Sequence, residues 1–215
     1  MRHKRFPLGP LWTNTYLVWD DSGTGFVVDP AAALDGIMDF MKREHITVEA
    51  VFLTHGHPDH IGGVPQAVEL LTKKVIVSRH DAPMVESPNP QVLAMTGYDF
   101  PGVRGLTYVE GGERIAVGRM SVEVIATPGH TKGGTCYLAT QDQDALLLTG
   151  DTLFAGSVGR TDLPGGDSAE LERSIERLSA FPDGLMVLPG HGPESTIGEE
   201  RRRNPFWPGR AGGWL

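Results

Sequence analysis

The chain has 215 residues, of which 40% are hydrophobic and 21% charged. This length is sufficient for a substantial core, and we expect a single domain covering residues 1–215. The formal net charge of −8 gives no general attraction to nucleic acid or to an anionic membrane, so neither is an expected partner. The single cysteine, Cys136, cannot form an internal disulfide, which fits a reducing compartment.

The N-terminal stretch is basic, but proline, glycine and polar residues interrupt it before a secretory apolar region could form. No apolar run approaches the roughly 18 residues that a bilayer span requires. We therefore expect a cytoplasmic protein.

The first third of the chain alternates between predicted strands and helices. Two apolar runs, 15–19 and 26–30, flank the turn sequence DDSGTG and predict a β-hairpin. The spacing of Leu34, Ile37, Met38 and Met41 then predicts a helix with one buried face. A buried strand (48–54), a helix (64–73) and another strand (73–78) are expected next. This alternation indicates a layered α/β architecture.

Residues 79–110 are rich in proline and glycine and predict a long surface segment with one helical turn, which forms a wall of the substrate pocket. A helix is expected at 168–180, capped by Asp167 or Ser168. The strands predicted in this part of the chain are 113–118, 120–127, 134–140, 144–150 and 185–189.

The C-terminal tail, 199–215, is polar, aromatic and rich in proline and glycine. Its aromatic residues Phe206, Trp207 and Trp214 are expected to dock on the domain or on a partner. The run of arginines at 201–203 follows two glutamates, which favours a solvated or ion-paired surface over a nucleic-acid site.

Side chains that commonly bind metals follow several of the apolar runs. The carboxyl ends of strands in open α/β sheets are where sites tend to form, so these side chains are expected to converge. They are His55, His57, Asp59 and His60 after VFLT, His130 after VIATPG, Asp151 after LLLTG, and His191 after MVLPG.

A single loop histidine is more often hydrogen-bonded than bound to a metal. Three histidines and one aspartate between positions 55 and 60 would be a costly crowd of partly buried polar groups without a ligand. Pro58 biases His57 away from helical geometry and so predicts an extended or turning loop. The full set exceeds what one tetrahedral ion can use, and it suits two ions about 3.5–4 Å apart with one bridging group.

The stretch THGHPDH resembles the first metal motif of the metallo-β-lactamase superfamily, and TPGHT, TGDTLF and PGHGP resemble its later motifs in the same order. GRTDLPGGD and GHGPESTIGEERRRNP are similar to the glyoxalase II-like branch. The resemblance implies a four-layer αβ/βα sandwich. It also implies one metal site from His55, His57 and His130, a second from Asp59, His60 and His191, and Asp151 as the bridge.

The resemblance implies hydrolysis by a metal-bound hydroxide, with Asp59 and Asp151 as catalytic residues. Two divalent ions would lower the pKa of a shared water toward neutrality. A thiolate leaves without a general acid, so a thioester is the least demanding substrate, and S-D-lactoylglutathione or a related small molecule is expected. Imidazole and carboxylate ligands accept zinc, iron or manganese, and zinc or iron is the expected metal.

The glyoxalase II resemblance weakens at substrate recognition, because the short stretch after His191 leaves no room for the branch's separate C-terminal helical domain. Arg160 and Lys132 are candidate contacts to an anionic, glutathione-linked substrate. Their alternatives are a salt bridge with Asp162 for Arg160 and simple solvation for Lys132. Asp29 is interpreted as a support for a ligating histidine, not as a ligand.

The main alternative function is a mono-iron persulfide dioxygenase, which resembles this branch but does not use the second site. A non-catalytic protein on the same fold is disfavoured because the ligand set is complete. Lactonase, β-lactamase and phosphodiesterase activities stay open, since fold and metals do not fix the substrate. The sequence carries no signal for the oligomeric state.

Overall fold

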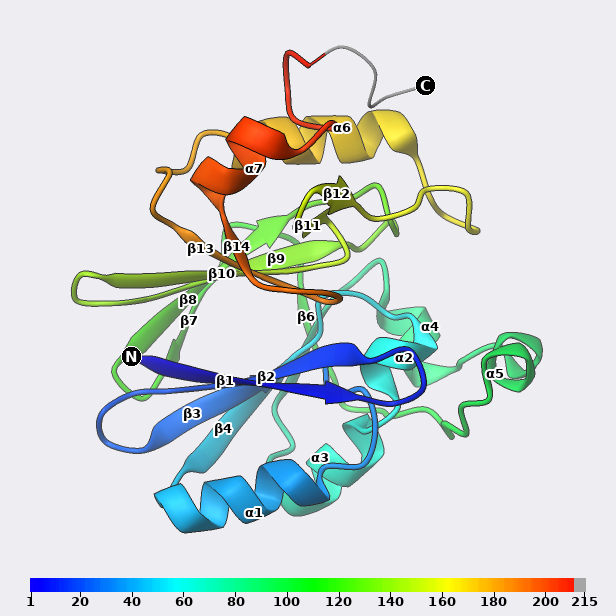
Figure 1. Ribbon diagram of the computed structural model, residues 1–215. Helices are drawn as coiled ribbons and strands as arrows, with labels where there is room; N and C mark the ends of the chain where they lie inside the picture. The colour runs from blue at the N-terminus through cyan, green and yellow to red at the C-terminus, as the bar shows by residue number, and fades with distance from the viewer. Residues whose placement is uncertain (211–215) are drawn as a thin grey trace.

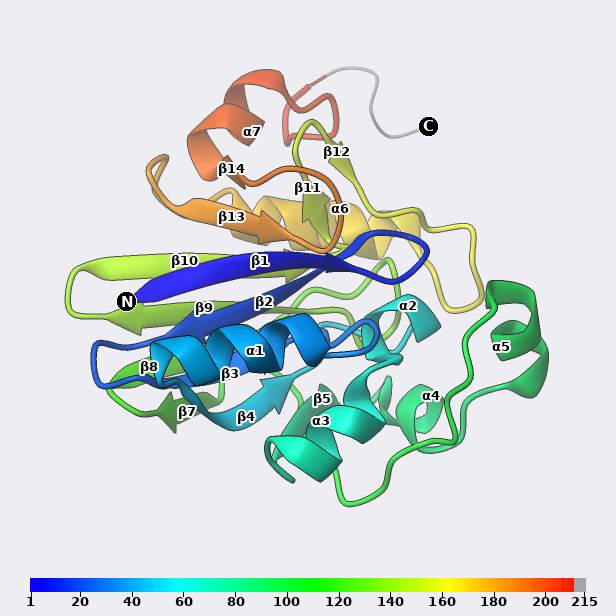
Figure 2. The same cartoon turned by 60° about the horizontal axis from the view of Figure 1, so that its bottom comes forward.

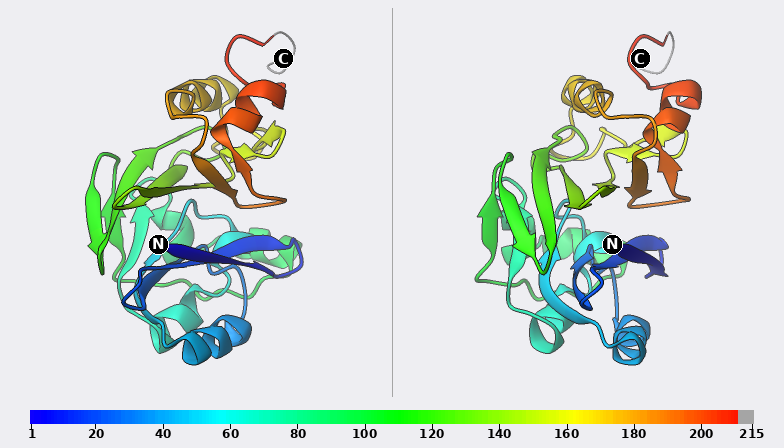
Figure 3. Two further views of the ribbon diagram at one scale, coloured as in Figure 1. Left: turned by 60° about the vertical axis from the view of Figure 1, so that its left-hand side comes forward. Right: turned by 90° about the vertical axis from the view of Figure 1, so that its left-hand side faces the viewer.

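The computed structural model describes residues 1–210 and, for Met95, the backbone alone. Two six-stranded sheets face each other, and helices cover the outer face of each (Figures 1 and 3). This arrangement confirms the expected α/β class and the four-layer αβ/βα sandwich.

The first sheet comes from the N-terminal part of the chain, and its strands follow one another in sequence order. β1, β2 and β3 are antiparallel, whereas β3 to β6 are parallel. Its strands are β1 (Arg2–Leu8), β2 (Thr13–Trp19), β3 (Thr24–Val28), β4 (Thr47–Phe52), β5 (Val75–Ser78) and β6 (Thr107–Val109).

The second sheet has the order β14-β13-β10-β9-β8-β7, with β10 and β13 parallel and the other pairs antiparallel. A separate two-stranded hairpin, β11 (Leu153–Phe154) with β12 (Ser157–Val158), follows β10. The strands of the sheet are β7 (Arg114–Val117), β8 (Met120–Ala126), β9 (Thr135–Gln141), β10 (Asp144–Gly150), β13 (Met186–Pro189) and β14 (Ser195–Thr196).

Helices lie outside both sheets. Figure 2 shows α1 and α3 on the outer face of the first sheet, and Figure 1 shows α6 and α7 above the second. The helices are α1 (Asp35–Glu44), α2 (Pro58–Ile61), α3 (Val64–Leu70), α4 (Ala82–Glu86), α5 (Pro90–Thr96), α6 (Ser168–Leu178) and α7 (Ile197–Arg203). None of the helices in the described part of the chain has the length and apolar character that a bilayer span requires.

Three apolar cores separate the four layers. Leu17 and Ile37 belong to the core between the first sheet and its helices, and Phe52 and Tyr137 pack edge to face, with ring centroids 5.0 Å apart, between the two sheets. Cys136 belongs to the core beneath α6 and α7, where burial raises its pKa to about 11. The position of Cys136 in the middle of a strand predicts this role in the core.

Several predicted elements are confirmed. The first hairpin forms as β2 and β3, and α1 buries Ile37 and Met41. The four strands expected between 113 and 150 are present as β7 to β10. α6 is capped by Asp167, whose side chain accepts from the backbone N–H of Glu170. These elements have strong local signals, namely regular periodicity and clear caps.

Other elements differ from the expectation. Segment 79–110 contains two helices, α4 and α5, and the strand β6. Asn89 caps α5, Pro90 is its first residue, and Gly97 ends it with φ +73°, so its start and stop signals were present in the sequence. The first residues of the polar tail belong to α7, which Thr196 caps by accepting from the N–H of Glu199. β1 was also not predicted.

The expectation of docking aromatic residues holds for Trp207, which is buried in the core beneath α6 and α7. Trp214 lies outside the described residues. The arginines of α7 form surface ion pairs, as expected, because Arg202 and Arg203 both contact Glu199.

Candidate metal centre

The seven candidate ligands lie in the loops that follow four strands. His55 and His57 come after β4, His130 after β8, Asp151 after β10 and His191 after β13. Asp59 and His60 follow in the one-turn helix α2. Pro58 occupies the first position of that helix, and His57 before it is extended (φ −70°, ψ 146°) as the proline requires.

Three histidines form the first group, hereafter the three-histidine group: His55, His57 and His130. One nitrogen of each lies within 4.8 Å of the others. His130 Nε2 is 2.9 Å from His57 Nδ1. The group joins the first half of the chain to the second, because His130 follows β8 of the second sheet.

Asp59, His60 and His191 form a second group, hereafter the mixed group, whose ligand atoms also lie within 4.8 Å of one another. Asp59 Oδ2 is 3.2 Å from His191 Nε2 and 3.5 Å from His60 Nε2. It also accepts a hydrogen bond from the Thr13 hydroxyl. This group, too, takes one residue from the second half of the chain.

Asp151 lies between the two groups. Its Oδ1 is 3.3 Å from His60 Nε2, and its Oδ2 is 3.6 Å from both His130 Nε2 and His191 Nε2. A carboxylate in this position can offer one oxygen to each of two ions.

The donor set fits divalent metal ions. His55 Nε2, His60 Nε2 and Asp151 Oδ1 are buried and make no hydrogen bond within the described residues. Leaving buried polar atoms unpaired costs free energy, about 1–3 kcal/mol each. His55 and His60 belong to the two groups and Asp151 lies between them, so cations there would satisfy all three atoms. Imidazole nitrogens and carboxylate oxygens suit zinc, iron or manganese.

Three of the histidines are oriented through their other ring nitrogen. His55 Nδ1 lies 3.1 Å from the Thr54 hydroxyl, and His130 Nδ1 lies 2.7 Å from the carbonyl oxygen of Arg160. His60 Nδ1 lies 2.8 Å from Asp29 Oδ2. Each contact leaves Nε2 facing the centre, which is how metal-binding histidines are usually held.

Asp29 is itself held in place. The backbone N–H of Thr54 donates to Oδ1 and its hydroxyl donates to Oδ2. Asp29 adopts φ +48°, a left-handed conformation that few residues other than glycine adopt. Since its oxygens are already engaged by Thr54 and His60, we interpret Asp29 as a support for His60.

The electrostatic environment differs between the two groups. Burial lowers the pKa of His55 well below its usual value, and burial together with His130 lowers the pKa of His57 to about 4. In the mixed group, burial disfavours the charged form of His60, but Asp151 and Asp59 outweigh it and raise the pKa of His60 well above its usual value.

The pKa values of the two carboxyl groups shift in the opposite direction to that of His60. Burial disfavours the charged forms of Asp59 and Asp151, but His60 outweighs it and lowers the pKa of both carboxyl groups. Burial also opposes the charging of His191, while its hydrogen bond to Asp59 raises the pKa of the imidazole. Both carboxylates are therefore ionised at neutral pH and ready to bind a cation.

Comparison with known proteins gives the family. The sequence profile of the metallo-beta-lactamase superfamily matches residues 8–191. The chain belongs to this superfamily. A probable metallo-hydrolase of Bacillus subtilis, YqgX, is 33% identical over 208 residues, which are 96% of this chain and 97% of that protein. The hydroxyacylglutathione hydrolase GloC of Haemophilus influenzae is 28% identical over 205 residues, 93% and 95% of the two chains.

Solved structures of the superfamily have the same fold. BLEG-1, a B3 metallo-beta-lactamase, superposes with a TM-score of 0.88 at 34% identity, covering 97% of this chain and 100% of that one. TTHA1623, in a di-iron-bound form, gives 0.83 at 33% identity, covering 94% and 99%. ETHE1 from Myxococcus xanthus gives 0.78 at 29% identity, covering 95% and 84%.

The predicted substrate contacts, Arg160 and Lys132, lie near the three-histidine group. The guanidinium of Arg160 forms a two-point salt bridge with Asp162, at 2.6 and 2.7 Å, while its backbone carbonyl contacts His130. Lys132 is exposed in the loop that follows His130. The Arg160 side chain thus adopts the ion pair foreseen as its alternative role.

The start of β2 borders the mixed group. Thr13 contacts Asp59, and Asn14 donates its side-chain N–H groups to the carbonyls of Pro189 and Gly192, on either side of His191. Trp12, before them, is 73% exposed with φ +55°. No local sequence pattern indicates Thr13 or Asn14, because their contacts depend on β2 lying beside the loop that follows β13.

Sequence reasoning also missed Asp81. It follows β5 as other site residues follow their strands, so the same rule could have found it. The proline- and glycine-rich composition of segment 79–110 predicts irregular structure and so hides this signal.

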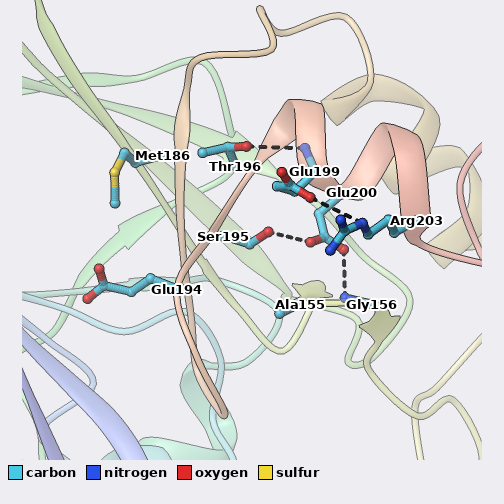
Figure 4. A pocket seen from close by; sticks show the side chains of 9 residues that line it. All are labelled: Ala155, Gly156, Met186, Glu194, Ser195, Thr196, Glu199, Glu200 and Arg203. Carbon is cyan, nitrogen blue, oxygen red and sulfur yellow. Dashed lines mark hydrogen bonds and ion pairs between the residues drawn. The ribbon is translucent and has the colours of Figure 1, made fainter.

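A cavity of about 560 Å³ lies between the β11–β12 turn, β14 and α7. Figure 4 shows the residues that line it. Its carboxylates are already engaged, since the buried Glu200 accepts from Gly156 N–H and from the Ser195 hydroxyl. None of the seven candidate ligands lines it, so it is separate from the metal centre. The lining residues are Ala155, Gly156, Met186, Glu194, Ser195, Thr196, Glu199, Glu200 and Arg203.

Proposed function

We propose that this protein is a metal-dependent hydrolase that cleaves S-D-lactoylglutathione or a related thioester. The observation that carries the proposal is the presence of two complete ligand groups with Asp151 between them. Each group would hold one divalent ion, zinc or iron, and manganese is also compatible with the ligands.

Two bound ions would lower the pKa of a shared water and polarise the substrate carbonyl. The chain's own contribution is to position the reacting groups. Asp59 is ionised and held by the Thr13 hydroxyl through Oδ2, so its other oxygen can orient an attacking water. Asp151 holds the two groups at a fixed separation, and the three supported histidines keep the geometry rigid.

The leaving group decides the substrate class. A thiolate, with a conjugate-acid pKa near 8.5, departs without a general acid, whereas an amine requires one. The similarity to a relative named hydroxyacylglutathione hydrolase supports the same assignment. We further propose that Arg160, whose carbonyl oxygen contacts His130, and Lys132, in the loop that bears His130, contact an anionic part of the substrate.

The second candidate is a mono-iron persulfide dioxygenase, which would use one iron on two histidines and one carboxylate. The similarity to ETHE1 keeps this candidate in consideration. The completeness of the mixed group favours the hydrolase, because a mono-iron enzyme has no use for Asp59, His60 and His191 arranged around a second ion.

The test uses protein purified without added metal, with the metal content measured on the same sample. Hydrolysis of S-D-lactoylglutathione and sulfite production from glutathione persulfide are assayed in parallel, with Asp151→Ala as the control for contaminating enzymes. Thioester turnover without sulfite supports the proposal. Sulfite production with oxygen uptake overturns it, and absence of both activities overturns the thioester assignment and directs the assays to lactones and phosphodiesters.

A further inference from the structure

Asp81 is a buried carboxylate that contacts the metal loops without being a candidate ligand. It follows β5 and occupies the position just before α4, where an aspartate ordinarily caps the helix. Its side chain makes no capping bond, although it is only 1% exposed. The carboxylate points instead toward the loops that carry the three-histidine group.

Three donors from two loops reach this carboxylate. The N–H of Gly56, between His55 and His57, donates to Oδ2 at 3.1 Å. The hydroxyl of Thr131, next to His130, donates to the same oxygen at 2.7 Å, and the N–H of Gly133 donates to Oδ1 at 2.8 Å. One carboxylate therefore joins the loop after β4 to the loop after β8, which belong to opposite halves of the molecule.

Two glycines, Gly56 and Gly133, allow the two loops to lie close to the Asp81 carboxylate. A Cβ at Gly133 would lie 2.6 Å from the Asp81 carboxyl carbon, and a Cβ at Gly56 would lie 2.8 Å from Met84 Cβ and 3.0 Å from the Asp81 carbonyl oxygen. Any side chain at these two positions would force the loops away from the carboxylate. Glycine at both positions lets the backbone N–H groups reach it.

We infer that Asp81 is a positioning residue of the metal centre, which sets the separation of the two loops so that His55, His57 and His130 are arranged before a metal binds. The inference rests on the proposed metal centre and assigns no contact between Asp81 and metal or substrate. Without this carboxylate, metal binding must also order the two loops, so the affinity of the three-histidine group for metal falls.

The first test compares Asp81→Asn with Asp20→Asn. Asparagine keeps the shape but presents an amide NH₂ group to at least one N–H or O–H donor. Asp20 is a matched control, because it is also 1% exposed and accepts from the N–H groups of Ser22, Thr24 and Arg119, at the opposite end of β2 from Thr13. Zinc affinity is measured on metal-free protein by competition with a chromophoric chelator.

We expect Asp81→Asn to weaken zinc binding by about 10- to 100-fold, the usual effect of losing a group that orients ligands. Asp20→Asn should lower the melting temperature without changing zinc affinity. Thr131→Val removes one of the three donors and keeps the carboxylate, so it should give a smaller loss of affinity. It also provides a readout if Asp81→Asn does not fold.

A double-mutant cycle assigns the effect to one group. Combined with His191→Ala, which leaves the three-histidine group intact, Asp81→Asn should still weaken zinc binding. Combined with His130→Ala, which disrupts that group, Asp81→Asn should cause little further loss of zinc affinity. The inference is overturned if Asp81→Asn and Thr131→Val bind zinc as the wild type does, or if Asp20→Asn weakens binding equally. The readout of this test is metal affinity. If the zinc-loaded wild type does not hydrolyse the thioester, the proposed function is overturned, but the role of Asp81 is not.

Discussion

The two halves of the molecule contribute to the metal centre in different ways. The half built on the first sheet supplies four candidate ligands from the short stretch 55–60. The half built on the second sheet supplies three, His130, Asp151 and His191, from three separate strand ends. The first contribution is local in sequence, whereas the second exists only after β8, β10 and β13 have formed one sheet.

Neither half holds a complete group. The three-histidine group and the mixed group each take two residues from the first half and one from the second, and Asp151 of the second half lies between them. Bound metal ions would therefore link the two halves, and the density of ligands in one loop does not make that loop a binding site by itself.

The largest effect is expected from Asp151→Ala. This change removes a carboxylate whose oxygens lie within 3.6 Å of histidines of both groups. We expect loss of metal and a decrease in kcat/KM of about a thousandfold, equivalent to about 4 kcal/mol. Metal analysis and steady-state kinetics check this expectation. Near wild-type activity would show that the second half supplies no bridge.

Acidification should distinguish the two groups. Metal ions compete with protons for histidine nitrogens. In the metal-free protein, His57 has a pKa of about 4 and stays neutral at pH 5–6, whereas the pKa of His60 and that of His191 are raised, so these two become protonated as the pH falls. The mixed group should therefore release its metal first as the pH is lowered from 8 to 5.

The measurement is metal content after dialysis at a series of pH values, with His191→Ala as the control that retains the three-histidine group. His191→Ala should retain the metal in its three-histidine group at a pH at which the wild type has already lost the ion from its mixed group. Simultaneous release of both ions would contradict the electrostatic difference between the groups.

The smallest effect on the metal centre is expected from Arg160→Ala. His130 is supported by the backbone carbonyl of Arg160, which the substitution retains, and the exposed ion pair with Asp162 contributes little to stability. Metal content and melting temperature should be unchanged. If Arg160 contacts an anionic thioester, KM rises about tenfold, while the matched Asp162→Ala raises it less. An unchanged KM in Arg160→Ala would limit Arg160 to its backbone role.

Some elements could be predicted because their signals are local. The stripe of Leu171, Ile175 and Leu178 and the cap at Asp167 lie within α6 itself. The expectation that His57 is extended needed only the following Pro58. By contrast, α5 and α7 have clear caps but lie in segments whose composition predicts irregular structure. Composition averages over a segment, and a cap is a signal at one residue.

Local sequence patterns predict the fold class and the candidate metal ligands, because strand periodicity and a dense histidine motif are properties of neighbouring residues. The orientation of those side chains depends on tertiary contacts. His60 presents Nε2 because Asp29 lies beside Nδ1, and His130 does so because the carbonyl of Arg160 lies beside its Nδ1. Asp81 joins two loops that are far apart in sequence. Such contacts form only when separate strand ends meet, so no local pattern encodes them.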